Sequence, residues 1–182
     1  MAWSDELKRQ AAGNQAGQYV VILPNIPVHL AQMQALPEAT LKEPQHTAAL
    51  AIAALTMYPV DQEASLQMLE FLQGPRGLTN YDRQFLADRF RDRDYVPRSY
   101  FAGATPQNNY EPSVPYTLTF FENPYSRSQL KDGYLTLYIK SGGGDNPRQV
   151  KLRTKPSTGQ WFLWEQFLLS GIRPPVSSDP WA

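Results

Sequence analysis

The sequence contains no cysteine and only two histidines among its 182 residues. The lack of cysteine excludes disulfides, thiolate metal ligands and cysteine nucleophiles. His29 and His46 lie 17 residues apart (46 − 29), and neither stands in an H-E-x-x-H pattern. Metal sites need several ligands on one face, so we predict neither a metal site nor a cofactor.

The sequence also lacks an excess of charge and a long apolar run. It has 17 Lys and Arg against 17 Asp and Glu, so no overall field draws it to a membrane, and the balance argues against nucleic acid. The longest apolar run, residues 48–55, is too short to span a bilayer. The first ten residues contain no apolar segment of signal-peptide length. We therefore expect a cytoplasmic protein.

Helical patterns fill the chain up to about Pro97. Pro44 suits the first turn of an apolar helix over residues 45–58, and Asp61 is a suitable N-cap for a helix over residues 62–73. Thr79 and Asp82 form a capping-box pattern for a third helix. We expect that helix to bury four residues, namely Tyr81, Phe85, Leu86 and Phe90.

Short alternating strands fill the rest of the chain, over about 116–122, 133–141, 148–155 and 160–168. The predicted fold class is α+β, with N-terminal helices (44–94) packed on a C-terminal four-stranded antiparallel meander (116–168). Residues 41–182 would form a single domain after a partly irregular extension, 1–40, in which residues 19–23 suit an edge strand. A cone-like sheet that wraps a helix and creates a pocket is the main variant. Residues 95–115 are rich in proline but also in aromatics, so we expect an ordered, packed loop.

Two segments carry a family resemblance: SYFAGATPQNNYEPSVPYT (99–117) and QWFLWEQFLLSGIRPPVSSDPWA (160–182). They resemble the signature and the usual C-terminus of a bacterial, firmicute-type family of domains of unknown function. The resemblance extends over most of the chain from about residue 41. It implies a recurring intracellular bacterial domain, and it brings no activity and no catalytic residues.

Strand alternation indicates one candidate binding surface. Alternate residues of a strand share a face. If the apolar faces point to the helices, the opposite face presents Tyr134, Tyr138, Lys140, Lys151, Arg153 and Lys155. Tyrosines interleaved with cations can hold an anionic or polar partner. The alternative is an ordinary solvated sheet face, since Thr, Tyr and Lys suit exposed strand positions.

Other chemistry has weaker support. Glu165 stands in the most apolar strand, where burial would make it a candidate acid, although an acid on the wet face or in a structural pair is the simpler interpretation. The aromatic loop residues Tyr100, Phe101 and Tyr110 are secondary binding candidates. We predict a non-catalytic intracellular binding or interaction module, whose partner is a protein, a small polar or anionic ligand, or a second copy of the chain. The alternatives are a small-molecule pocket protein or enzyme that uses Glu165, and a weak nucleic-acid binder through the basic strand face.

Overall fold

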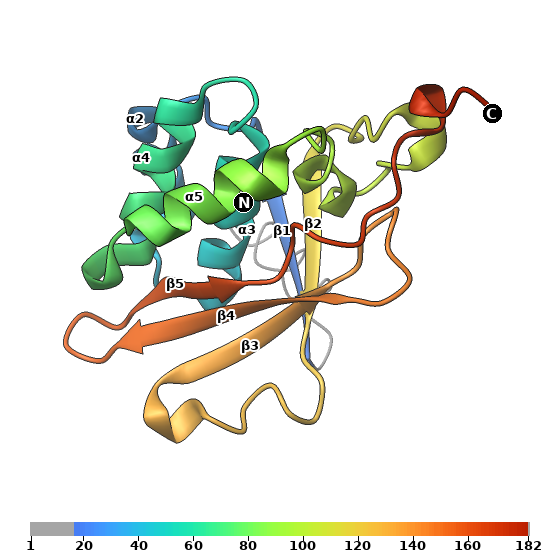
Figure 1. Cartoon of the computed structure of the whole chain (residues 1–182). Helices are drawn as coiled ribbons and strands as arrows, with labels where there is room; N and C mark the ends of the chain where they lie inside the picture. Colours follow the sequence, from blue (N-terminus) through green and yellow to red (C-terminus); the bar gives the residue numbers. More distant parts are fainter. Residues whose placement is uncertain (1–16, 182) are drawn as a thin grey trace, which may run out of the picture.

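A curled, five-stranded antiparallel sheet in the order β1-β2-β3-β4-β5 frames the protein. The structure is a computed structural model, and it describes residues 17–181. The strands are β1 (Gln18–Leu23), β2 (Tyr116–Phe121), β3 (Tyr134–Ile139), β4 (Arg148–Lys155) and β5 (Gln160–Gln166). The helices are α2 (Leu30–Gln34), α3 (Pro44–Thr56), α4 (Gln62–Gln73) and α5 (Asn80–Phe90), and they gather on one side of the sheet (Figure 1).

Helix α3 lies inside the curl of the sheet and contacts β1, β3, β4 and β5. Pro44 occupies its first turn, as predicted. Every residue from Ala48 to Leu55 is buried, with at most 1% of its surface exposed. A helix that is apolar all round needs such an environment, and the sheet supplies it through Leu135, Leu137, Ile139, Val150 and Leu152.

The α+β class is confirmed, but the count of four strands is wrong. The fifth strand, β1, matches the predicted edge strand and pairs along its whole length with β2, from Gln18 opposite Phe121 to Leu23 opposite Tyr116. The partners of this ladder lie about a hundred residues apart in the chain, and no local pattern can show such a pairing. β2 and β3 pair only at two positions before they diverge, which lets the sheet curl.

The caps of α4 and α5 form as predicted. The side chain of Asp61 accepts a hydrogen bond from Ala64 N at 3.1 Å. Thr79 and Asp82 make the reciprocal bonds of a capping box. Leu86 and Phe90 of α5 are buried and Phe85 is half-buried, whereas Tyr81 is 77% exposed. The expectation that Tyr81 is buried is therefore wrong, because its side chain lines an open groove between α5 and β5.

Residues 95–115 form an ordered, packed loop, as their aromatic content predicted. The loop holds the C-terminal segment through tyrosine hydroxyls. Tyr100 donates a hydrogen bond to Leu168 O, and Tyr110 donates one to Arg173 O at 2.6 Å. Burial raises the pKa of the Tyr100 hydroxyl, as expected for a group that serves only as a donor here.

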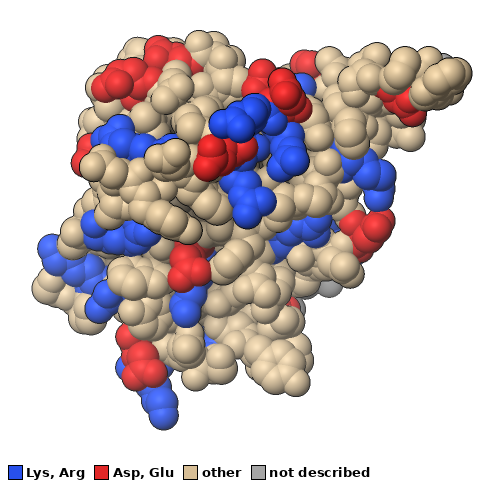
Figure 2. All heavy atoms as spheres, viewed as in Figure 1, with Lys and Arg blue, Asp and Glu red and all other residues tan. Residues whose placement is uncertain are grey.

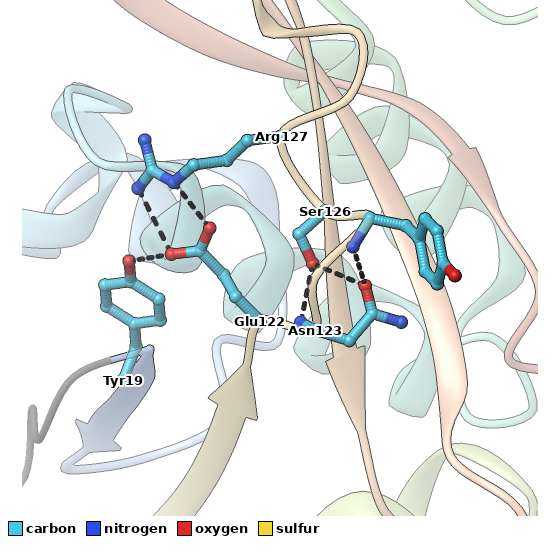
Figure 3. A network of polar contacts seen from close by, with 6 residues as sticks. Tyr19, Glu122, Asn123, Ser126 and Arg127 are labelled. Atoms are coloured by element: carbon cyan, nitrogen blue, oxygen red, sulfur yellow. Dashed lines mark hydrogen bonds and ion pairs between the residues drawn. The ribbon is translucent and has the colours of Figure 1, made fainter.

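A polar network fixes the loop between β2 and β3 (Figure 3). Glu122 accepts two hydrogen bonds from Arg127, at 2.6 and 3.1 Å, and one from the hydroxyl of Tyr19 on β1. Next to it, Asn123 N donates to Ser126 Oγ at 2.9 Å. Burial alone would raise the pKa of Glu122, but the bonds from Arg127 and Tyr19 hold it below its ordinary value. This acid is therefore a structural ion-pair partner.

The lowered pKa of Glu122 predicts a pH-dependent contribution to stability. A carboxyl whose folded pKa lies below its unfolded value stabilises the fold above the unfolded pKa, about 4.3, and loses that contribution as pH falls through the folded pKa. Glu122→Gln should lower the free energy of unfolding by about 1–3 kcal/mol at pH 7, and the gap to the parent should close as the solution is acidified. Urea denaturation at several pH values measures this.

The matched control for Glu122→Gln is Glu111→Gln, since Glu111 is exposed and its carboxylate makes no ion pair within residues 17–181. It should denature like the parent throughout. A Glu122→Gln gap that stays constant from pH 7 to pH 3 would contradict the assignment.

Candidate functional site

The outer face of β3, β4 and β5 brings together three of the predicted site residues. Tyr134 lies opposite Arg153 in the β3–β4 register. The guanidinium of Arg153 lies 5.3 Å from the ring centroid of Tyr134, and the ammonium of Lys151 lies 4.8 Å from the same centroid. Both distances are within the range of a cation–π contact. Half of the predicted surface therefore forms one compact group.

Trp164 joins this group through an irregularity in β5. The register of β4 and β5 shifts between Lys151 and Leu152, so that Leu163 faces Leu152 and Glu165 faces Lys151. Trp164 is the additional residue of this bulge. Its ring meets the ring of Tyr134 edge-on at 5.6 Å, and Arg153 lies 4.8 Å from its centroid. The Arg153 guanidinium thus contacts two aromatic rings.

Arg76 completes what we call the cation–aromatic cluster, which comprises Arg76, Tyr134, Lys151, Arg153 and Trp164. It stands in the short 3-10 segment η2 (Gly74–Arg76) that follows α4, and its guanidinium lies 5.9 Å from the Trp164 ring. Arg76 also bonds Asp82 through two nitrogens, at 2.9 and 3.1 Å. Burial alone would raise the pKa of Asp82, but the bonds from Arg76 and Thr79 hold it below its ordinary value.

The other two cations of the cluster are not neutralised in this way. Within residues 17–181 the ion pairs are Arg76–Asp82, Arg91–Asp88, Arg127–Glu122 and Arg173–Asp145. Lys151 and Arg153 appear in none of them, although Glu165 lies opposite Lys151 in the register. Their cationic groups therefore contact aromatic rings and remain available to bind an anion.

The remaining predicted residues lie outside the cluster. Tyr138 stacks on Phe121 with ring centroids 5.9 Å apart, near the opposite end of the β3–β4 ladder from Tyr134. Lys140 is exposed and borders a second hollow, about 520 Å³, beside the loop of residues 99–104. Lys155 is exposed at the end of β4, next to the β4–β5 turn. The predicted surface is thus divided into separate parts.

The secondary candidates have other roles. Tyr100, Phe101 and Tyr110 are 4% exposed or less, so their rings serve the core and do not form a contact surface. Glu165 is exposed, which agrees with the simpler interpretation of an acid on the solvated face and contradicts the alternative of a buried acid. The bulge turns both Trp164 and Glu165 to the outer face after the buried Leu163.

A groove of about 480 Å³ lies between α5 and β5, next to the cluster. Its apolar floor includes Leu55, Leu69 and Leu163, and its rim includes aromatic side chains. The charged residues that line it are Arg76, Asp82, Arg89 and Glu165. Sequence reasoning missed this groove, because it depends on how α5 diverges from the edge of β5.

The histidines have local roles. His29 caps α2 and accepts a hydrogen bond from Gln32 N at 3.2 Å. His46 lies in the first turn of α3, where burial lowers its pKa. In the described part of the chain, no group of three or more His, Asp or Glu side chains is arranged to hold a metal ion.

Charges of both signs are interspersed on the face that carries α5, with large uncharged areas between them (Figure 2). Nucleic-acid binding proteins usually show a basic stripe or patch, and this face shows none. Among residues 17–181, no helix has the length and apolar character needed to cross a membrane.

Comparison with known proteins gives one match. The family described as Domain of unknown function (DUF6935) matches residues 25–176. No curated protein and no solved structure matches the chain.

Proposed function

The chain belongs to the DUF6935 family, and we propose that it is a non-catalytic binding module of the cytoplasm whose contact surface is the cation–aromatic cluster. The observation that supports this is the environment of the Lys151 and Arg153 side chains. Both cations lie on aromatic rings, and neither has an acidic partner within residues 17–181.

This arrangement suits a carboxylate-bearing partner. The planar guanidinium of Arg153 can offer paired N–H donors to a carboxylate, while the rings of Tyr134 and Trp164 hold the guanidinium plane in place. Tyr and Trp supply large contact area at low entropic cost and are enriched at interfaces. The partner that fits best is therefore a protein surface that presents Asp or Glu side chains.

A catalytic role has less support. Glu165 is exposed, and catalytic acids usually depend on burial or a charged neighbour of like sign. The hydroxyl of Ser141 bonds the hydroxyl of Ser99 at 2.7 Å and accepts from Gly143 N. Neither contact supplies a general base, so no nucleophile is prepared in the manner of a serine hydrolase.

The double variant Lys151→Glu with Arg153→Glu tests the proposal. Loss of charge-assisted bonds worth about 1.5–3 kcal/mol should weaken partner binding about tenfold or more. Capture of partners from host lysate, quantified by mass spectrometry at low and high salt, measures this. The parent should lose its partners as salt rises, since exposed charges are screened within about 10 Å at 0.1 M salt.

The matched control is Arg83→Glu with Lys131→Glu, which makes the same change in charge at two exposed positions that are not part of the cluster. It should capture the same partners as the parent. The control should melt like the parent, because exposed charges seldom carry stability, and the double variant should remain folded, since Arg153 is exposed and Lys151 is half-buried. Equal capture by the double variant and the control would refute the cluster as the contact surface.

A further inference from the structure

β5 is an edge strand whose outer side is closed at one end and open at the other. At the closed end, Trp161 N donates to Leu41 O at 2.7 Å, and Trp161 O accepts from Thr47 Oγ1 at 2.7 Å. Beyond it, the backbone of residues 163–166 makes no hydrogen bond to any described segment outside the sheet. Main-chain groups alternate between the two sides of a strand, so Leu163, two residues after Trp161, also directs its N–H and C=O outward.

The groove lies along this open half of β5. Leu163, Trp164 and Gln166 form one wall and α5 forms the other, through Tyr81, Phe85 and Arg89. Figure 1 shows α5 running beside β5 and diverging from it toward the end of the strand. The four residues of this open edge span about 13 Å, so it offers room for a short extended segment. An edge of unpaired N–H and C=O groups is a template for another strand.

The aromatic residues of the groove provide sites for side chains. Tyr81 is 77% exposed and stacks on Phe85, and Phe167 is 49% exposed. An extended peptide places alternate side chains on opposite sides. Apolar side chains on one side of such a peptide would meet this aromatic rim and the leucine floor, and the side chains on the other side would reach the cation–aromatic cluster.

The charges around the groove favour an acidic peptide. Four cations, Arg76, Arg89, Lys151 and Arg153, stand in or beside it against two carboxylates, Asp82 and Glu165. Asp82 is engaged by Arg76, and Glu165 faces Lys151 across the strands. Arg89 lies 5.0 Å from the Phe85 ring centroid and has no ion pair within residues 17–181.

We propose that the groove between α5 and β5 receives an extended acidic peptide, which adds to the open edge of β5 as a sixth strand. The proposal rests on the proposed function and gives it a partner class: a flexible segment of another protein in which acidic and apolar residues alternate. The backbone of β5 provides the hydrogen bonds, the groove accepts the apolar side chains, and Arg89 and the cluster bind the acidic ones.

Selection from a displayed library of random heptapeptides on the full chain provides the probes. Acidic peptides with alternating apolar residues should be enriched. The synthesised peptides should bind Arg89→Glu at least tenfold more weakly than the parent. They should bind Arg83→Glu, an exposed change on the same helix outside the groove, within twofold of the parent. The same selection is carried out in parallel on Arg89→Glu. If no peptide is enriched more strongly on the parent than on this variant, the proposal is overturned.

Two measurements distinguish strand addition from other modes of binding. The Leu163 amide should exchange its hydrogen more slowly when a selected peptide is bound. In an added strand, every second amide of the peptide faces β5 and the others face away. N-methylation of the amides that face β5 should abolish binding, and N-methylation of the others should not. Peptides that bind without protecting Leu163, or for which the two methylated sets behave alike, would refute strand addition.

The pattern of losses separates this proposal from the one on which it rests. Loss of peptide binding in Lys151→Glu with Arg153→Glu, but not in Arg89→Glu, would leave the cluster as the contact surface and refute the groove. Loss of peptide binding in Arg89→Glu alone would refute the cluster as the contact surface and would support the groove as the peptide site. Sedimentation of the free protein should show a monomer; a dimer that protects Leu163 would assign the edge to a second copy and overturn the peptide proposal.

Discussion

Ile52→Asp is expected to destabilise the protein by about 4 kcal/mol or more, because it places an unpaired carboxylate where no water and no cation can reach it. Ile52 has no exposed surface, and its neighbours on α3 are alanines and leucines buried to the same degree. Domains of this kind are stable by only about 5–15 kcal/mol. The variant should therefore unfold at much lower urea concentration than the parent, or fail to fold at all.

Ile22→Asp makes the same substitution at an exposed position, since Ile22 on the edge strand β1 is 47% exposed. It should change the free energy of unfolding by about 1 kcal/mol or less. A second comparison, Ile52→Val, removes one methylene and should cost about 0.5–1.5 kcal/mol, which keeps the test informative if Ile52→Asp does not fold. An Ile52→Asp protein that denatures like Ile22→Asp would show that α3 is not the core helix.

Helices α3, α4 and α5 and four of the strands could be predicted because their signals are local, whereas α2 lies in the segment expected to be partly irregular. Pro44, Asp61 and the Thr79–Asp82 box lie within one turn of the helix starts that they specify. β4 has the predicted bounds because its alternation is regular from Arg148 to Lys155. The membership of β1 in the sheet could not be inferred in this way, since its partner β2 follows about a hundred residues later.

The candidate site could be predicted only in part, for a related reason. Tyr134, Lys151 and Arg153 follow from the alternation of β3 and β4. Trp164 does not, because the bulge opposite Lys151 and Leu152 interrupts the period of β5. Arg76 reaches the cluster from the end of α4, and its position depends on the packing of Gly74 against the Phe162 ring, where no Cβ would fit. These features depend on tertiary packing and have no signature in a single sequence.

The two segments that carry the family resemblance serve mainly to hold the fold together. Tyr100 and Tyr110, in the first segment, bond the backbone of Leu168 and Arg173 in the second. Arg148 adds bonds to Ser170 O and Gly171 O, at 3.2 and 2.9 Å. The cation–aromatic cluster draws only Trp164 from these segments, whereas the β5 wall of the proposed peptide groove lies within the second segment.

The glycines between β3 and β4 lie where these two segments meet, and Gly142→Ala should therefore cost about 3 kcal/mol, at the upper end for overpacking. A Cβ at Gly142 would lie 2.1 Å from the backbone oxygen of Ala104, which cannot rotate away as the end of a flexible side chain could. Gly142 N also donates to Ser99 O at 2.8 Å, so moving the turn to relieve the clash would break this bond. The free energy of unfolding in urea measures the effect.

Gly144→Ala, two residues further along the same turn, distinguishes close packing from a general need for flexibility. The nearest atoms to a Cβ at Gly144 would be those of the Arg148 guanidinium, at 3.1 Å, which would need to move by only a few tenths of an ångström. The Gly144→Ala variant should stay within about 0.5 kcal/mol of the parent. Equal losses in the two variants would mean that the turn needs glycine for its conformational freedom. A loss confined to Gly142→Ala would mean that the backbone of the aromatic loop packs directly on the turn, and that this contact helps to hold the C-terminal segment in place.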